Sequence, residues 1–196
     1  SLFPFSVAGY NYIMTKFYTQ TGDDGYTGLL GDERVAKYSP RMEAIGALDE
    51  ATAALGLVRA LCRAPATGTI LLEVQRHLYH IMAETAATTE NASRFRVIDS
   101  QHVTWLEEQT DSISSQVNLP NEFIIAGDSV AGGALALART IVRRAERRVA
   151  QLVHSGQLEN RQLLRYLNRL SSLCFVLELY ENQNDGQSAP TLAKAP

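Results

Sequence analysis

The sequence has few of the residues that build disulfide frameworks or membrane spans. Its 196 residues include two cysteines and one tryptophan, and no apolar run approaches the ~20 residues that a membrane span requires. Cys62 and Cys174 lie in apolar helical surroundings, which favours buried thiols in a reducing compartment over a disulfide or a metal site. We therefore expect a cytoplasmic protein without a membrane partner. The organellar matrix is the alternative if a presequence has been removed.

The chain also lacks an excess of charge of either sign. Eighteen Lys and Arg residues against 21 Asp and Glu residues leave a net charge of −3, so the surface as a whole is not built to attract nucleic acid. Hydrophobic residues make up 45% and charged residues 20%, which is the balance of a globular domain. We expect a disordered lead or cloning remnant over 1–13, a single domain over 14–182 and a flexible tail over 183–196.

Prolines are few and widely spaced, which leaves long stretches free to form helices. Apolar residues at helical spacing predict helices from Pro40 to near Pro65, then over 69–87, from a Ser100 cap to 117, over 129–155 and over 160–182. No alternating strand pattern is present in the sequence. The predicted fold is all-α: an antiparallel five-helix domain that resembles a four-helix bundle, preceded by a glycine-rich N-terminal loop.

A glycine recurs at every third position near the start of the chain, at Gly22, Gly25, Gly28 and Gly31. Such a segment cannot form a stable helix. Its exposed N–H groups, with neighbouring threonine hydroxyls and Lys37, could surround a polyphosphate. Asp23, Asp24 and Asp32 would repel that anion unless Mg²⁺ intervened. A plain flexible linker is an equally good interpretation of the loop by itself.

Arginines gather in the second half of the chain. Between positions 139 and 169 there are eight arginines and two acidic residues, a local charge of +6. Arg139 and Arg143 share one helical stripe with Glu146, and Arg144 and Arg148 share another. Arginine favours bidentate recognition of phosphate or carboxylate. The spacing leaves an anion site and a salt-bridged helix face equally open.

Two other groups of polar residues interrupt apolar helices. Glu73, His77, His80 and Glu84 share one helical stripe, for which a hydrated outer face is a better interpretation than a metal site. Asp49, if buried, needs a cation, and Arg139 is a candidate within the subunit or across an interface. The alternative is that Asp49 and Glu50 form an exposed acidic pair. No nucleophilic triad is recognisable. The sequence therefore indicates either an enzyme that works by positioning its substrates, without covalent side-chain catalysis, or a binding protein.

Five segments, taken in order, resemble the PduO-type ATP:cob(I)alamin adenosyltransferases. They are YTQTGDDG at 18–25, GDERVAK at 31–37, EAIGALDE at 43–50, RRAERR at 143–148 and YLNRLS at 166–171. The resemblance covers about residues 15–180. It implies a homotrimer of helical bundles that binds MgATP and cobalamin in sites between subunits.

The reaction that the resemblance implies is an attack of the cob(I)alamin cobalt on the 5′ carbon of ATP, which gives adenosylcobalamin and triphosphate. Cobalt is itself the nucleophile, so the protein must align the substrates and stabilise the leaving group. The product could pass to an adenosylcobalamin-dependent enzyme. The chain departs from the family pattern at Gln20, Asp32, Asp128 and Ser172. A degenerate, non-catalytic sensor or carrier of nucleotide or cobalamin is therefore the alternative.

The resemblance also assigns roles to residues. The implied ATP-binding residues are Thr19, Gln20, Thr21, Gly22, Thr27, Lys37, Arg143, Arg144, Glu146, Arg147 and Asn168. The implied catalytic group is Arg143, Phe123, Arg139 and Asp49. Arg139 would pair with Asp49 across the subunit boundary. Phe123 would be the aromatic wedge in the cobalamin site that displaces the lower axial ligand, because a four-coordinate cobalt(II) centre is easier to reduce. No metal ligand is assigned.

Overall fold

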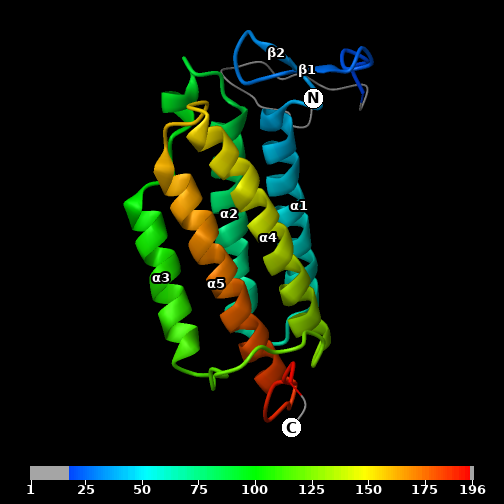
Figure 1. Cartoon of the computed structure of the whole chain (residues 1–196), viewed down its shortest axis with the longest axis vertical. Coiled ribbons are helices and arrows are strands. Elements are labelled where there is room, and N and C mark those ends of the chain that lie inside the picture. The colour runs from blue at the N-terminus through cyan, green and yellow to red at the C-terminus, as the bar shows by residue number, and fades with distance from the viewer. Residues whose placement is uncertain (1–17, 195–196) are drawn as a thin grey trace.

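Five α-helices dominate residues 18–194, the part of the chain that the computed structural model describes (Figure 1). The helices are α1 (Pro40–Leu61), α2 (Pro65–Ala86), α3 (Ser100–Ser114), α4 (Val130–His154) and α5 (Arg161–Asn184). A short 3₁₀ helix, η1 (Ala92–Phe95), follows α2. The predicted all-α bundle is confirmed. The expected lead at 1–13 lies outside the described residues.

Helix boundaries follow from capping side chains. The Ser129 side chain accepts a hydrogen bond from the N–H of Gly132 at the start of α4. The Asn160 side chain accepts one from the N–H of Gln162 at the start of α5. Asp99 caps α3 in place of the expected Ser100, and that helix ends at Ser114 rather than near 117. The second helix begins at Pro65 rather than 69, because proline fits the first turn of a helix.

The core lies between α1, α2, α4 and α5, with α3 packed on α5. It is built mainly from leucine, isoleucine and valine, and Tyr166 is its largest fully buried side chain. Cys174 is buried and Cys62 is partly buried, and both are free thiols. No helix within residues 18–194 is long and apolar enough to cross a membrane.

The glycine-rich segment contains an antiparallel hairpin of β1 (Tyr26–Gly28) and β2 (Arg34–Ala36), which the sequence did not predict. The connection between the two strands is fastened to the end of α2. The N–H of Leu30 donates to the carbonyl of Ala86 at 2.8 Å, and the N–H of Thr88 donates to the carbonyl of Leu30 at 3.3 Å. Figure 1 shows the hairpin at the end of the bundle where α1 begins.

Arg41 strengthens the same junction from the first turn of α1. Its buried guanidinium donates to the carbonyls of Thr85 and Ala87, both at 2.9 Å, and to the carbonyl of Gln157 at 3.1 Å. These carbonyls lie at the end of α2 and in the α4–α5 connection, where no N–H group of a helix is available to pair with them. One side chain therefore joins three segments beneath the hairpin.

The tail expected over 183–196 stays a prediction, and within residues 183–194 the chain is partly ordered by helix and main-chain pairing. Helix α5 runs to Asn184, and a β-bridge then pairs Leu192 with Ile124 in the α3–α4 connection. This pairing depends on residues about 70 positions apart, so local composition could not predict it. Figure 1 shows the C-terminal segment at the opposite end of the bundle from the hairpin.

Candidate functional site

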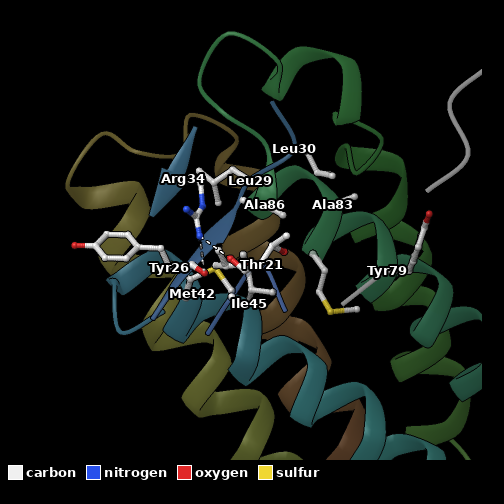
Figure 2. Close-up of a pocket in the computed structure, with 14 residues that line it drawn as sticks. Thr21, Tyr26, Leu29, Leu30, Arg34, Met42, Ile45, Tyr79, Ala83 and Ala86 are labelled. Atoms are coloured by element: carbon white, nitrogen blue, oxygen red, sulfur yellow. Dashed lines mark hydrogen bonds between the residues drawn. The ribbon is translucent and has the colours of Figure 1, made fainter. Parts of the chain in front are cut away.

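A cavity of about 340 Å³ opens between the hairpin and the helices α1 and α2 (Figure 2). Its wall includes the apolar side chains of Met42 and Ile45 from α1 and Met82 from α2. Thr21 and Gly22, both predicted to bind nucleotide, line it from the glycine-rich loop, and Thr27 lines it from β1. An apolar wall beside exposed main-chain N–H groups suits a ligand with one flat hydrophobic part and one anionic part.

Arg34 of β2 holds the glycine-rich loop in shape. Its Nη2 donates to the carbonyl of Thr21 at 2.8 Å and to Oδ1 of Asp24 at 2.9 Å, and Figure 2 shows Arg34 reaching toward Thr21. The hydrogen bond from Arg34 lowers the pKa of the Asp24 carboxyl. One of the acidic side chains expected to repel a phosphate is therefore neutralised inside the loop.

Lys37 lies against the same loop. Its Nζ donates to the carbonyl of Gly22 at 2.6 Å, and the hydroxyls of Thr19 and Thr21 are 2.9 Å apart. A Cβ atom added at Gly22 would lie 2.9 Å from the Lys37 Nζ, so glycine lets the lysine approach the main chain. The structure thus brings these predicted residues together. Gln20 beside them is exposed and has a left-handed backbone with φ of 62°.

The arginines of α4 divide into two groups. Arg144 forms an ion pair with Glu50 of α1, and Arg148 lies 3.6 Å from Glu43 of the same helix. Arg143 and Arg147 are exposed, and neither makes a hydrogen bond or ion pair with another residue in the range 18–194. The salt-bridged interpretation therefore holds for Arg144 and Arg148, while an anion site at Arg143 and Arg147 stays a prediction.

Glu146 and Asn168 meet beside the unpaired arginines. The Asn168 side-chain amide of α5 donates to Oε1 of Glu146 of α4 at 3.0 Å. Neither residue lines the cavity beneath the hairpin, and neither do Arg143 and Arg147. The two halves of the predicted nucleotide site are thus separate within one chain: one half lies on the hairpin, α1 and α2, and the other on α4 and α5.

Asp49 and Arg139 are not paired with each other within the described chain. Asp49 is half-buried, and the Nε of Arg139 is buried without a hydrogen-bond partner. Arg139 instead lies near Glu178 of α5, whose side chain is buried and whose Oε1 also has no partner. Burial raises the pKa of Glu178 to about 7, against the opposing effect of the Arg139 charge. Pairing across a subunit boundary stays a prediction.

Phe123 lies in the α3–α4 connection. Figure 1 shows this connection at the opposite end of the bundle from the hairpin. The Phe123 side chain is 88% exposed. An aromatic ring left in water is costly and indicates a contact surface when it belongs to a defined loop. The structure therefore leaves Phe123 free to meet a ligand or another chain.

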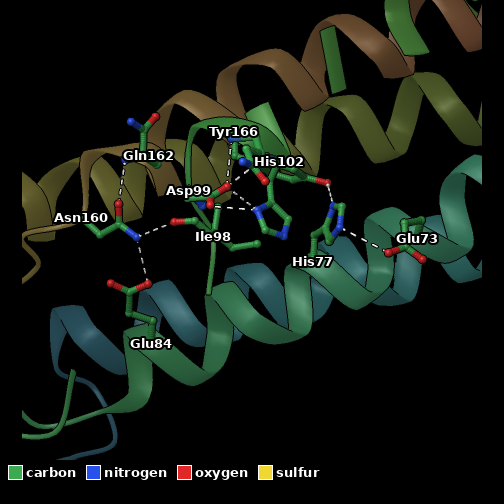
Figure 3. A network of polar contacts seen from close by, with 10 residues as sticks. Glu73, His77, Glu84, Ile98, Asp99, His102, Asn160, Gln162 and Tyr166 are labelled. Carbon is green, nitrogen blue, oxygen red and sulfur yellow. Dashed lines mark hydrogen bonds and ion pairs between the residues drawn. The ribbon is translucent and has the colours of Figure 1, made fainter. Parts of the chain in front are cut away.

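The stripe on α2 is not the hydrated outer face that the sequence indicated (Figure 3). His77 is buried, and its Nδ1 lies 2.9 Å from the hydroxyl of Tyr166, with the rings of His102 and Trp105 packed edge-on against it. Helix α3 covers this side of α2, and periodicity within α2 could not show that. Burial lowers the pKa of His77.

Glu84, at the end of the same stripe, is also buried. It accepts hydrogen bonds from Asn160 at 3.0 Å and from Arg96 at 3.3 Å, and burial raises the pKa of its carboxyl. These contacts join α2 to the start of α5 and explain the residue as part of the fold. Within residues 18–194 no group of three or more His, Cys, Asp or Glu side chains could hold a metal ion.

Sequence reasoning missed Arg34 and the apolar wall of the cavity. Arg34 lies three residues before Lys37, so a second basic residue in the loop was the available signal. Met42 and Met82 both line the cavity, although the chain has three methionines in all. Methionine is common at adaptable apolar binding surfaces, which was the signal for the wall.

Comparison with known proteins gives a consistent set of similarities. The family model described as cobalamin adenosyltransferase matches residues 17–181. The chain is 39% identical over 173 residues to the corrinoid adenosyltransferase PduO of Citrobacter freundii, covering 87% of this chain and 51% of that protein. It thus spans about half the length of that relative. It is 37% identical to a corrinoid adenosyltransferase of Bacillus subtilis (strain 168), covering 87% and 89% of the two chains.

Solved structures show the same likeness. A variant PduO-type ATP:corrinoid adenosyltransferase from Lactobacillus reuteri, complexed with cobalamin and ATP, superposes with a TM-score of 0.83. That comparison covers 92% of this chain and all of the other, at 32% sequence identity. A second variant of that enzyme, complexed with ATP, superposes with a TM-score of 0.81.

Proposed function

The chain belongs to the cobalamin adenosyltransferase family, and we propose that it transfers the 5′-deoxyadenosyl group of ATP to cob(I)alamin. The observation that carries the proposal is the cavity beneath the hairpin. Its polar mouth brings Thr21 and Gly22 next to Lys37, and its wall is apolar. Relatives of this chain are named corrinoid adenosyltransferases, and one similar structure holds both ATP and cobalamin. No described feature favours the non-catalytic alternative.

The proposed reaction is a substitution at the 5′ carbon of ATP. The electron pair of cobalt(I) forms the cobalt–carbon bond while the bond from carbon to triphosphate oxygen breaks, and triphosphate leaves with the bonding electrons. No side chain has to exchange a proton in this step. The protein contributes alignment, worth up to about 7–11 kcal/mol in well-oriented systems, and stabilisation of the leaving anion.

The glycine-rich loop would hold the triphosphate. Its main-chain N–H groups, the hydroxyls of Thr19, Thr21 and Thr27, and the Lys37 ammonium all suit phosphate oxygens. Gln20 supplies an amide to the same region. Mg²⁺ would arrive with ATP, bound to the phosphates, and its charge would offset the repulsion from the acidic side chains of the loop.

We further propose that the chain forms a homotrimer and that each active site is shared between two copies. Arg143 and Arg147 are unpaired and do not line the cavity of their own chain. The hairpin and the α3–α4 connection that carries Phe123, here called the Phe123 loop, lie at opposite ends of one bundle (Figure 1). The glycine-rich loop of one copy would therefore have to meet α4 of the next copy. The exposed apolar side chains of Val130 and Leu137 on α4 and Leu57 on α1 offer contact surface for such an assembly.

In this arrangement Arg143 and Arg147 would stabilise the departing triphosphate, with Glu146 and Asn168 orienting them or the adenosine. Arg144 would contribute positive charge from the neighbouring stripe. Arg139, whose Nε lacks a partner, would pair with the half-buried Asp49 of the adjacent copy.

Phe123 would be the wedge in the cobalamin site that displaces the lower axial ligand of cobalt. Its exposed ring supports that role, because the ligand would then supply the apolar contact that the chain itself does not. We propose that the reaction takes place in the cytoplasm and that the product passes to an adenosylcobalamin-dependent enzyme.

An anaerobic turnover assay tests the proposed function. The full chain is mixed with ATP, Mg²⁺ and chemically reduced cobalamin, and the formation of a light-sensitive adenosylated product is followed by absorbance. We expect product and triphosphate in equal amounts. Absence of product from a folded protein that binds both substrates would contradict the proposal.

A further inference from the structure

The loop that carries Phe123 takes its main-chain support from the C-terminal segment. Within the described chain, residues 118–127 make two main-chain hydrogen bonds, and both go to this segment. The N–H of Ile125 donates to the carbonyl of Thr191 at 2.8 Å, and the N–H of Ala193 donates to the carbonyl of Phe123 at 2.7 Å. The main chain of Phe123 itself is therefore held by residues that follow the last helix.

Asp128 fastens the C-terminal segment from the other side. One carboxylate oxygen accepts the N–H of Thr191 at 2.9 Å, and the other accepts the Thr191 hydroxyl at 2.6 Å. Hydrogen bonds to a carboxylate are stronger than those between neutral groups. Asp128 directly precedes Ser129, the capping residue of α4, whose hydroxyl donates to Oδ1 of Asn182 at 2.6 Å. The contact between Asp128 and Thr191 therefore lies directly beside the start of α4, which is itself bonded to α5.

This contact adds little to the hydrophobic core. Ile125 and Leu192, on the two sides of this β-bridge, are 51% and 41% exposed. Packing does not hold the Phe123 ring either, since it is 88% exposed. The polar contacts therefore determine where the loop lies, while the bundle gains little stability from them.

We propose that Asp128 and Thr191 are positioning residues that clasp the C-terminal segment onto the Phe123 loop and so place Phe123 for cobalamin. This inference rests on the proposed function, because it concerns the cobalamin side of that site. It also explains the departure from the family pattern at Asp128, because the carboxylate at that position binds the chain's own C-terminal segment.

Hydrogen exchange of the ligand-free full chain tests the clasp as a structure. Thr191→Val keeps the side-chain shape and removes the hydroxyl, Thr191→Ser is its matched control, and Asp128→Ala removes both acceptors. We expect the Ile125 amide to exchange about tenfold faster in the Val and Ala variants, with the Ser variant close to wild type. Unchanged exchange in both the Val and Ala variants would overturn the clasp.

Turnover and the spectrum of bound cob(II)alamin test the positioning role. We expect about tenfold lower kcat/KM for cobalamin in Thr191→Val, an unchanged KM for ATP, and a smaller four-coordinate cobalt(II) fraction, all restored in Thr191→Ser. Variants that match an active wild type in all three readouts would overturn the inference. A wild type that forms no product would instead contradict the proposed function.

Discussion

Arg143 has a guanidinium that its own chain leaves unpaired on the exposed side of α4. If it stabilises the departing triphosphate, Arg143→Ala should lower kcat by roughly 10²-fold, as removal of one preorganised charge donor does elsewhere. The measurement is anaerobic turnover at saturating ATP and cob(I)alamin. Arg165→Ala is the matched control, because Arg165 is an exposed arginine on α5 without an ion pair in the described chain. Equal losses in the two variants would refute the assigned role.

Glu178 makes stability depend on pH. Its pKa in the folded chain is about 7, above its ordinary value of 4.5, because burial disfavours the carboxylate. The stability that it contributes is therefore fully present below pH 4.5 and is lost as the pH rises through about 7. Glu178→Gln should raise the free energy of unfolding at pH 8 by roughly 1–3 kcal/mol, and by less at pH 5. Urea unfolding at the two pH values measures this.

Glu181 provides the matched control for that change, one helical turn further along α5. Its two carboxylate oxygens accept the N–H groups of Arg63 and Ala64, at 2.9 and 3.3 Å, ahead of α2. Glu181→Gln replaces one of these acceptors by a donor and should lower stability, the opposite sign to the change at Glu178. Destabilisation of both variants at pH 8 would contradict the account of Glu178.

Single residues were predictable where chemistry and local spacing agreed. Thr21, Gly22 and Lys37 are close in sequence, and the structure brings them together at one loop. His77 was assigned to the wrong environment, because its own helix gives its stripe but not the helix α3 that covers it. A partner that comes from a distant segment leaves no trace in local periodicity.

At the scale of elements, Gly132 shows how closely α4 and α5 approach. A Cβ atom added there would lie 2.0 Å from Oδ1 of Asn182, the acceptor of the Ser129 hydroxyl. Gly132→Ala should therefore lower the free energy of unfolding by roughly 1–3 kcal/mol, through displaced packing and a broken buried hydrogen bond. Chemical denaturation measures the change.

Gly133 is the neighbouring control for that prediction. The nearest atom to a Cβ added at Gly133 is 3.6 Å away, which is ordinary contact. Because alanine favours a helix over glycine by up to about 1 kcal/mol, Gly133→Ala should be neutral or stabilising. Equal destabilisation of the two variants would show that the close approach at Gly132 is not the cause.

Gly31 joins the hairpin to the end of α2. Its φ of 152° is a conformation that favours glycine, and an added Cβ would lie 2.6 Å from Cγ2 of Thr88. We expect Gly31→Ala to loosen the hairpin and to raise the KM for ATP severalfold, while the helices stay intact by circular dichroism. Gly46→Ala, whose Cβ meets nothing within 4 Å, is the control. An unchanged KM for ATP in Gly31→Ala would contradict this prediction, because it would show that nucleotide binding does not depend on how the hairpin docks.

The helices were predictable because long apolar periodicity and capping residues determine them within the chain itself. The three-residue strands of the hairpin and the β-bridge between Ile124 and Leu192 were not predictable, because such short pairings depend on partners that only the tertiary fold supplies.

At the scale of the whole molecule, one chain holds every predicted site residue but does not assemble them. The loop half of the nucleotide site lies at one end of the bundle, and the α3–α4 connection that carries Phe123 lies at the other. Arg143 on α4 does not line the cavity. In the proposed reaction cobalt has to reach the 5′ carbon directly, so these regions would have to meet. Assembly of copies is the simplest way to bring them together.

The central claim is that two copies share each active site, and complementation between inactive variants tests it most directly. Lys37→Ala removes the loop cation and Arg143→Ala removes the α4 cation, so each variant by itself should have low activity. In trimers assembled from both variants in equal amounts, about a quarter of the sites should combine an intact loop with an intact α4 and recover activity. Mixed trimers no more active than the separate variants would contradict a shared site.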